Sequence, residues 1–384
     1  MKKKNRRMPV ISLIMLDVGL TIAGLGLYLL YDYVMPHAGG EGVVVAQIDS
    51  ESTNTFSLPN RSEPVQESDE QPAETEYAHT TTKTTGEAQT GDNDSPATTT
   101  VTTAPAETET KRTTKNKYDN TGVDEYETDN ISVSQVLNAT VDSTEIGHYS
   151  NDEADITVYQ KSIFEGKEKI TYYVADVYVT NVGAIRTALA EDTYGKNIKE
   201  SVSDMAGNNN AIWAVNGDFY GNSEEGLVVR NGVKYRDNLN DVDICVLYTD
   251  GSMETFPHSN FDMDEVMEKG VWQAWCFGPM LLDGNGNVLD SFNTTTYLNS
   301  ANPRSAIGCV APGHYVFMTV DGRDKGYSRG ATMSELAALM AHEGCKVAYN
   351  LDGGMSALMY YDGDIINEPD RGGRSISDII YVGR

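Results

Sequence analysis

The sequence predicts a strand-rich α+β domain of mixed sheet with few helices, preceded by one transmembrane helix and a disordered stalk. Short runs of β-branched and aromatic residues recur towards the C-terminus, and Gly, Asn or Asp turns separate most of them. One long helix is clear among these runs. A change in composition near residue 130 separates them from an acidic, Thr-rich segment. The chain of 384 residues therefore divides into segments 1–9, 10–35, 36–130 and 131–384.

The N-terminus has the pattern of an uncleaved signal anchor. Five basic residues stand in the cytoplasmic segment 1–9, and a mostly apolar run follows over 10–35. A helix of that length crosses a bilayer core, and the run is longer than the apolar region of a signal peptide. Asp17 lies inside the run, where a carboxylate is costly, so a cleaved signal peptide stays the alternative. The basic residues predict a cytoplasmic N-terminus and an extracellular C-terminal domain at the cell membrane.

Segment 36–130 is rich in Thr, Glu, Ser, Asp and Pro and contains few large apolar residues. Such a segment cannot bury enough surface to offset its ordering entropy. We therefore expect a disordered stalk between the membrane and the domain. A flexible coil of this length reaches on the order of 50 Å.

The charge of the chain limits the class of partner. The net charge is −28, and the predicted domain over 131–384 carries −18 of it. A strongly acidic domain does not attract nucleic acid, so we expect no nucleic-acid partner. A small anionic ligand stays compatible with this charge, because it needs only a local basic cluster.

The four cysteines are Cys245, Cys276, Cys309 and Cys345. Because no CxxC pair occurs, the sequence does not predict a zinc site. The cysteines lie in or beside apolar runs, where disulfides and buried free thiols are both compatible with the sequence. Their spacing does not choose among the three possible pairings.

The predicted domain consists mainly of short strands joined by tight turns. Strands are expected at 156–159, 170–179 and 211–215, hairpins around Gly166, Asn231-Gly232 and Asp250-Gly251, and a further turn at 283–287. A short helix is expected at 197–205.

The clearest helix begins after Thr332. Thr332 and Glu335 fit a capping box, in which each side chain bonds to the backbone N–H of the other residue. Apolar residues then follow at helical spacing, and Gly344 ends the helix. The helix connects a strand ending near Val320 to one ending near Leu351, which predicts a β-α-β unit with parallel strands.

Five polar motifs stand at the ends of predicted strands. They are Asn216-Gly217-Asp218, Gly278-Pro279, Asn302-Pro303-Arg304-Ser305, Asp321-Gly322-Arg323 and Asn350-Leu351-Asp352-Gly353-Gly354-Met355-Ser356. Each motif taken alone is compatible with an ordinary turn. Together they offer carboxylates beside guanidinium groups, a combination that suits an anionic substrate needing acid–base help. We expect the motifs to meet in one cleft.

In this order, and with Ser328-Arg329-Gly330-Ala331-Thr332 between the last two, the motifs resemble those of the phosphodiester glycosidase family. The resemblance covers about 211–382, and extends more loosely from 156. Met355 departs from the third glycine that is common in the last motif of the family. A side chain at this position is expected to narrow the site.

The resemblance implies hydrolysis of a sugar-1-phosphodiester between the anomeric carbon and oxygen, in cell-surface glycans or exopolysaccharide. Arg304, with Arg323 second, is then expected to hold the phosphodiester. Asp352 or Asp218 assists the attacking water or the developing oxocarbenium charge, and Asp321 positions sugar hydroxyls or orients an arginine. The remaining expected substrate-binding residues are Asn216, Asn302, Gly353, Gly354 and Ser356.

A function from another class fits the same fold, namely a non-catalytic module that binds glycan or organises the envelope. The acidic and arginine residues at the strand ends favour the enzyme. Trp213, Trp272 and Trp275 lie in apolar runs and resemble core residues more than sugar-stacking platforms. We expect no required cofactor, and a divalent cation held by the three aspartates is the alternative.

Overall fold

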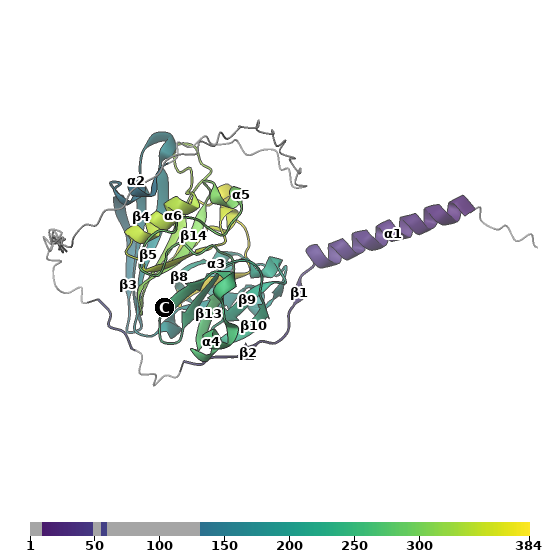
Figure 1. The fold of residues 1–384 in the computed structure, drawn as a ribbon, viewed down its shortest axis with the longest axis horizontal. Helices are drawn as coiled ribbons and strands as arrows, with labels where there is room; N and C mark the ends of the chain where they lie inside the picture. Colours follow the sequence, from purple (N-terminus) through teal and green to yellow (C-terminus); the bar gives the residue numbers. More distant parts are fainter. Residues whose placement is uncertain (1–9, 49–54, 60–130) are drawn as a thin grey trace, which may run out of the picture. The chain divides into compact units, whose positions relative to one another are not determined.

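The computed structural model describes residues 10–48, 55–59 and 131–384 (Figure 1). Three antiparallel sheets form most of the part over 131–384. The helices of the described residues are α1 (Val10–Tyr33), α2 (Val133–Leu137), α3 (Val202–Asn208), α4 (Met263–Glu268), α5 (Thr296–Asn299) and α6 (Met333–His342). The predicted strand-rich α+β class with few helices is confirmed, whereas the predicted mixed sheet is not, because the strands of the described residues pair antiparallel throughout.

The first sheet has the strand order β16-β14-β15-β5-β4-β3. Its strands, in that order, are Val347–Leu351, Arg304–Ala311, His314–Val320, Ile170–Val179, Ala154–Ile163 and Asp142–Ser150. Helices α2 and α6 lie over this sheet (Figure 1), where their apolar side chains form one buried cluster with those of β5, β14 and β15.

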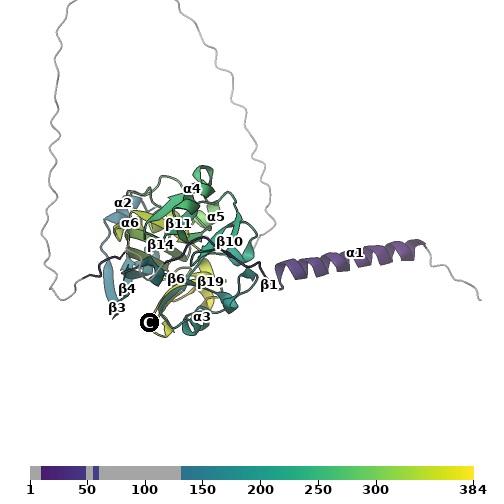
Figure 2. The same ribbon diagram turned by 90° about the horizontal axis from the view of Figure 1, so that it is seen from below.

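Two further sheets complete the domain. The second contains β12 (Met253–Phe256), β11 (Ile244–Tyr248), β13 (Val271–Trp275), β9 (Gly226–Arg230), β10 (Val233–Asn238) and β2 (Val43–Val44). The third contains β18 (Asp364–Ile365), β17 (Met359–Tyr361), β8 (Ala211–Asn216), β19 (Asp378–Gly383) and β6 (Arg186–Leu189), with β19 and β6 side by side in Figure 2.

The largest hydrophobic cluster is shared by all three sheets. It contains Ile156 of β4, Trp213 of β8, Trp275 of β13 and Phe317 of β15, and Trp272 packs against it. Burying one large apolar side chain contributes about 1.5–3 kcal/mol. The three tryptophans therefore belong to the core or its edge, as their apolar runs predicted.

The local turn signals predicted the hairpins correctly. Strands β4 and β5 pair across the turn that contains Gly166, and β9 pairs with β10 across Asn231-Gly232. Strands β11 and β12 pair across Asp250-Gly251. The strand predicted at 211–215 is β8, which is buried along its whole length. The helix predicted at 197–205 begins later, at Val202, because Ser201 caps it.

The capped helix α6 is confirmed. Thr332 is its N-cap, both bonds of the capping box with Glu335 are present, and Gly344 follows the helix with a φ of 83°. The strands that α6 connects, β15 and β16, run in the same direction as predicted. They are not neighbours, because β14 lies between them and pairs antiparallel with both.

Helix α1 occupies most of the predicted anchor segment 10–35. Within the described residues, no helix has the length and apolar character needed to span a membrane. The predicted membrane span is therefore not confirmed and stays a prediction.

The stalk prediction for 36–130 needs a correction at its start. Residues 37–38 form β1, which pairs with β7 (Gly195–Lys196), and β2 extends the second sheet by pairing with β10. This part of the segment is thus ordered against the domain, since it completes strands that otherwise lie at sheet edges. The predicted disorder of 60–130 lies outside the described residues.

All four cysteines are free thiols in the described structure. Cys245, Cys309 and Cys345 are buried, whereas Cys276 is half-buried. Burial raises the pKa of Cys276 to about 11 and that of Cys309 to about 12. Of the two states that the sequence left open, the structure shows the free thiol.

Candidate active site

Strand pairing brings the predicted motifs to one edge of the domain. β14 begins at Arg304 opposite the end of β15, and Ser305 lies opposite the end of β16. Because β14 runs antiparallel to both, the residues before β14 and those after β15 and β16 meet at one edge. The end of β8 joins them, since Asn216 accepts from the Ser305 hydroxyl at 2.6 Å and donates to the Asp352 carbonyl at 2.7 Å.

Two hollows lie at this edge, and we call them together the cleft. The larger one, of about 260 Å³, is lined among others by Phe277, Tyr297, Asn302, Arg304, Arg323 and Met355. The smaller one, of about 10 Å³, is lined by Lys199, Asp218, Phe219 and Ser356 among others. Asp352 and Arg374 line both hollows, so the two adjoin. The structure therefore brings Asp352 and the predicted arginines together.

Asp352 stands at the centre of the cleft and is 7% exposed. Arg374 Nη2 donates to its Oδ2 at 2.8 Å, and the Ser356 hydroxyl and the Gly353 N–H also donate to the carboxylate. Burial raises the pKa of Asp352 above its usual range, while Arg374 and the other donors oppose the rise. A buried carboxylate of this kind in a cleft is typical of groups that exchange a proton with a substrate.

Sequence reasoning missed Arg374, which binds Asp352. Its Nε donates to Ser356 Oγ at 2.5 Å, and its guanidinium lies 5.2 Å from the centre of the Phe219 ring. Lys199 adds a second cation to the smaller hollow, and burial followed by the charge of Arg374 lowers the pKa of Lys199. The sequence pattern that could have indicated Arg374 is Arg371-Gly372-Gly373-Arg374, in which two arginines flank a glycine pair before the last strand.

Arg304 lies beneath the larger hollow and is 3% exposed. Its Nε donates to the Ala331 carbonyl at 2.9 Å, and its Nη2 donates to the carbonyls of Leu298 and Ser300. No described carboxylate pairs with it. Burial, followed by the charge of Arg323, lowers the pKa of Arg304 to about 9. An anion in the hollow would offset this buried charge. Arg304 also anchors the loop that carries α5.

Arg323 faces the larger hollow with its donors partly engaged. Its Nη1 donates to Asp370 Oδ2 at 2.7 Å, and its Nη2 donates to Asn302 Oδ1 at 2.7 Å and to the Tyr297 hydroxyl at 3.2 Å. Asn302 in turn donates its amide to the Tyr297 carbonyl, which holds the α5 loop. Three arginines, at positions 304, 323 and 374, face two carboxylates, Asp352 and Asp370. The net charge of these five side chains is therefore positive.

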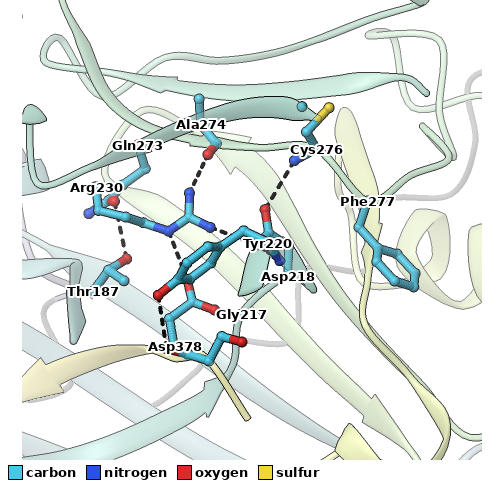
Figure 3. Close-up of polar contacts among 12 residues, drawn as sticks. Thr187, Gly217, Asp218, Tyr220, Arg230, Gln273, Ala274, Cys276, Phe277 and Asp378 are labelled. Carbon is cyan, nitrogen blue, oxygen red and sulfur yellow. Dashed lines mark hydrogen bonds and ion pairs between the residues drawn. The ribbon is translucent and has the colours of Figure 1, made fainter. Parts of the chain in front are cut away.

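Asp218 shares a buried guanidinium, that of Arg230, with Asp378 (Figure 3). Arg230 Nη2 lies 2.8 Å from Asp218 Oδ1, and its Nε donates to Asp378 Oδ2 at 2.7 Å. Asp218 Oδ2 accepts from the Cys276 N–H at 3.1 Å. Burial raises the pKa of Asp378 to about 7 against the effect of Arg230. This network fixes Asp218 at the wall of the smaller hollow.

The glycine of the Asn216-Gly217-Asp218 motif has a packing reason. A Cβ on Gly217 would lie 2.3 Å from Asp378 Oδ1, and the Gly217 N–H donates to the Asp378 carbonyl at 2.9 Å. Only a residue without a side chain lets Asp378 approach this closely.

Asp321 lines neither hollow, although it was predicted as catalytic. Its carboxylate accepts from Asn367 Nδ2 at 2.7 Å and from the Glu368 N–H and the Tyr327 hydroxyl, both at 2.9 Å. Burial raises the pKa of Asp321 to about 6. Its contacts hold the start of the loop that continues to Arg374. Among the described residues, no group of three His, Cys, Asp or Glu side chains is placed to hold a metal ion.

The backbone amides of Gly353 and Gly354, two of the expected substrate-binding residues, are engaged within the protein. The Gly354 N–H donates to the Pro303 carbonyl at 3.0 Å, and the Gly353 N–H faces the Asp352 carboxylate. A Cβ on Gly353 would lie 2.6 Å from the Pro303 carbonyl oxygen, so the glycine permits close packing. Asn216 lines neither hollow, because its amide holds the ends of β14 and β16.

Residues 209–383 match the model of one protein family, described as phosphodiester glycosidase. The SPbeta prophage-derived uncharacterized protein YomE of Bacillus subtilis (strain 168) is 31% identical over 196 residues, which cover 49% of this chain and 30% of that protein. The chain thus matches less than a third of the length of this relative.

Two solved structures match this chain at low similarity. The zebrafish N-acetylglucosamine-1-phosphodiester alpha-N-acetylglucosaminidase catalytic domain, auto-inhibited by its pro-peptide, is 17% identical with a TM-score of 0.49, covering 64% of this chain and 88% of that one. A hypothetical protein from Synechocystis is 13% identical with a TM-score of 0.46, covering 59% and 62%.

Proposed function

We propose that the chain hydrolyses a sugar-1-phosphodiester, on the basis that residues 209–383 match the model of the phosphodiester glycosidase family. Water attacks the anomeric carbon, and the bond from that carbon to the phosphodiester oxygen breaks. The products are a free sugar and a phosphomonoester.

One observation carries the proposal: a buried carboxylate, Asp352, stands between two hollows beside arginines whose summed charge is positive. Arg304 supplies a buried positive charge that forms no ion pair with a described carboxylate, and Arg323 and Arg374 present guanidinium groups at the surface of the cleft. Guanidinium groups match the geometry of phosphate oxygens. The larger hollow, of about 260 Å³, lies just below the usual range of roughly 300–1,000 Å³ for small-molecule sites.

The roles follow from this geometry. The leaving phosphate is a weak base, so its departure needs stabilisation of negative charge, which the arginines supply. Asp352, when ionised, accepts the proton of the attacking water or stabilises the positive charge that develops on the sugar. Asp218 lines the adjoining hollow in a rigid frame and is the second candidate for either role. Met355 narrows the larger hollow and thereby limits the sugar.

The proposal extends to location. Helix α1 exposes large apolar side chains along its described length, among them Leu20, Leu25 and Leu30, and five basic residues precede it. This pattern supports a single membrane span with a cytoplasmic N-terminus and an extracellular domain that acts on cell-surface glycan or exopolysaccharide. Protease added to intact cells is expected to degrade residues 131–384. Full protection in intact cells, with degradation only after lysis, would contradict this location.

Hydrolysis in ¹⁸O-labelled water tests the reaction and the bond that breaks. The purified chain is incubated with sugar-1-phosphodiesters that differ in sugar and aglycone, and the products are analysed by mass spectrometry. We expect the label in the free sugar, because water attacks carbon. The corresponding sugar-1-phosphomonoester serves as the comparison substrate.

Two outcomes would overturn the proposal. Label in the phosphomonoester would mean cleavage at phosphorus and a different class of hydrolase. Saturable binding without turnover across the panel would favour the glycan-binding module, for which the exposed rings of Phe219 and Tyr297 at the cleft would provide stacking surfaces.

A further inference from the structure

The residues that follow α1 lie along the domain in an extended form. Only three residues separate the end of α1 at Tyr33 from the start of β1 at His37. The Gly39 N–H donates to the Tyr194 carbonyl at 2.7 Å, and the N–H groups of Val45 and Ala46 donate to the Gly232 carbonyl at 2.8 and 3.1 Å. We call residues 37–48 and 55–59 the strap.

Apolar side chains of the strap enter the domain at separate places. Val45 packs against a buried apolar cluster formed by residues of β9, β11 and β13 in the second sheet. Ile48 packs against the largest cluster, which the three sheets share. Phe56 donates its backbone N–H to the Thr180 carbonyl at 2.8 Å, and its ring lies over Gly251 and Gly313. The strap is therefore held by strand pairing and by burial together.

Glycines on both sides make the close approach of the strap possible. A Cβ on Gly195 of the domain would lie 2.1 Å from the His37 carbonyl oxygen, although this glycine has an ordinary φ. On the strap, a Cβ on Gly39 would lie 2.4 Å from the Tyr194 ring, and one on Gly42 would lie 2.3 Å from Val233 Cγ1. These three glycines fit the docked strap and have no positive-φ turn to explain them.

From these contacts we propose that the strap is a structural part of the domain, held to residues 131–384 by its own contacts and not only by its covalent connection to them. The described residues of the strap and those of 131–384 fall in one compact unit. This proposal does not depend on the proposed hydrolysis.

The proposal has a consequence that can be measured. A cut within 60–130 leaves two chains, one with the strap and the other with residues 131–384. We expect the two pieces to stay together after the cut, because the strap contacts join them.

The test places a site-specific protease sequence within 60–130 of the full-length protein, which carries an affinity tag at its N-terminus. The protein is bound to resin in detergent, cut, and washed. We expect the C-terminal piece to stay on the resin in buffer and to elute with denaturant. Elution of that piece on cutting alone would overturn the proposal.

A matched pair of strap variants makes the test specific. Gly42→Val places a side chain against Val233 and the Tyr235 ring, whereas a Cβ on Gly40 meets nothing within 4 Å. We expect Gly42→Val to speed release of the cut C-terminal piece on the order of tenfold or more, as overpacking of an interface does. Gly40→Val is expected to behave as the unsubstituted protein. Equal release from both variants would show that other contacts hold the pieces, and the proposal would fail.

Discussion

Replacing Asp352 by Asn is expected to lower kcat on sugar-1-phosphodiesters on the order of 10²–10³-fold with little change in folding. The amide keeps the size of the side chain but carries no negative charge and accepts no proton from water. Arg374 loses its ionic partner, while its bonds to Ser356 and its contact with Phe219 stay. The measurement is steady-state kinetics on purified proteins together with a thermal unfolding curve.

The pH profile gives a second readout of the same group. Activity that needs ionised Asp352 is present above its pKa and falls as pH drops through that pKa. Burial raises the pKa of Asp352 and Arg374 lowers it, so Arg374→Ala is expected to raise it further. The acid limb of the kcat/KM profile should then move to higher pH in the variant.

The matched control is Asp364→Asn, which changes an exposed aspartate on β18. It is expected to leave kcat and the pH profile unchanged. Near-normal turnover by a folded Asp352→Asn protein would remove Asp352 from the chemistry, and Asp218 would become the first candidate. If the acid limb of the kcat/KM profile does not move in Arg374→Ala, a group other than Asp352 determines its pH.

Replacing Arg230 by Met is expected to destabilise the fold by about 3–5 kcal/mol, because it leaves Asp218 and Asp378 buried without their shared cation. Asp378, whose pKa burial already raises, would then bind a proton still more readily in the folded state than in the unfolded chain. The folded state of the variant therefore gains stability as pH falls. Its loss of unfolding free energy, relative to the unsubstituted protein, should be smaller at pH 5 than at pH 8. Urea unfolding at the two pH values measures this.

Arg371→Ala is the matched control, because its side chain is 75% exposed and its nearest carboxylate contact is 3.9 Å. Its effect on the free energy of unfolding is expected to stay within about 0.5 kcal/mol at both pH values. If Arg230→Met loses as much unfolding free energy at pH 5 as at pH 8, then lost packing, rather than lost charge pairing, causes most of the destabilisation.

The features that the sequence predicted correctly depend on neighbours in the chain. The capping box of Thr332 and Glu335 and the turn at Asn231-Gly232 are specified by residues within three or four positions. The meeting of Arg304 with Asp352 was also predictable, because both flank strands that end in polar motifs.

The features that were missed depend on contacts distant in sequence. Arg230 and Asp378 are 148 residues apart, and neither stands in a motif of its own. Glu335 was assigned to the capping box alone, but Arg329 also donates two bonds to it in the buried interior. Docking of the strap was missed because its two-residue strands are too short for a periodic pattern.

The free thiols described above bear on how the chain reaches its folded state. Because thiolate is the species that reacts with oxidants, raised pKa values keep Cys276 and Cys309 inert at neutral pH. Packing rather than disulfide cross-linking then holds the described part of the chain together. The same domain should fold in the reducing cytosol of a production host, and dithiothreitol should leave its unfolding temperature unchanged.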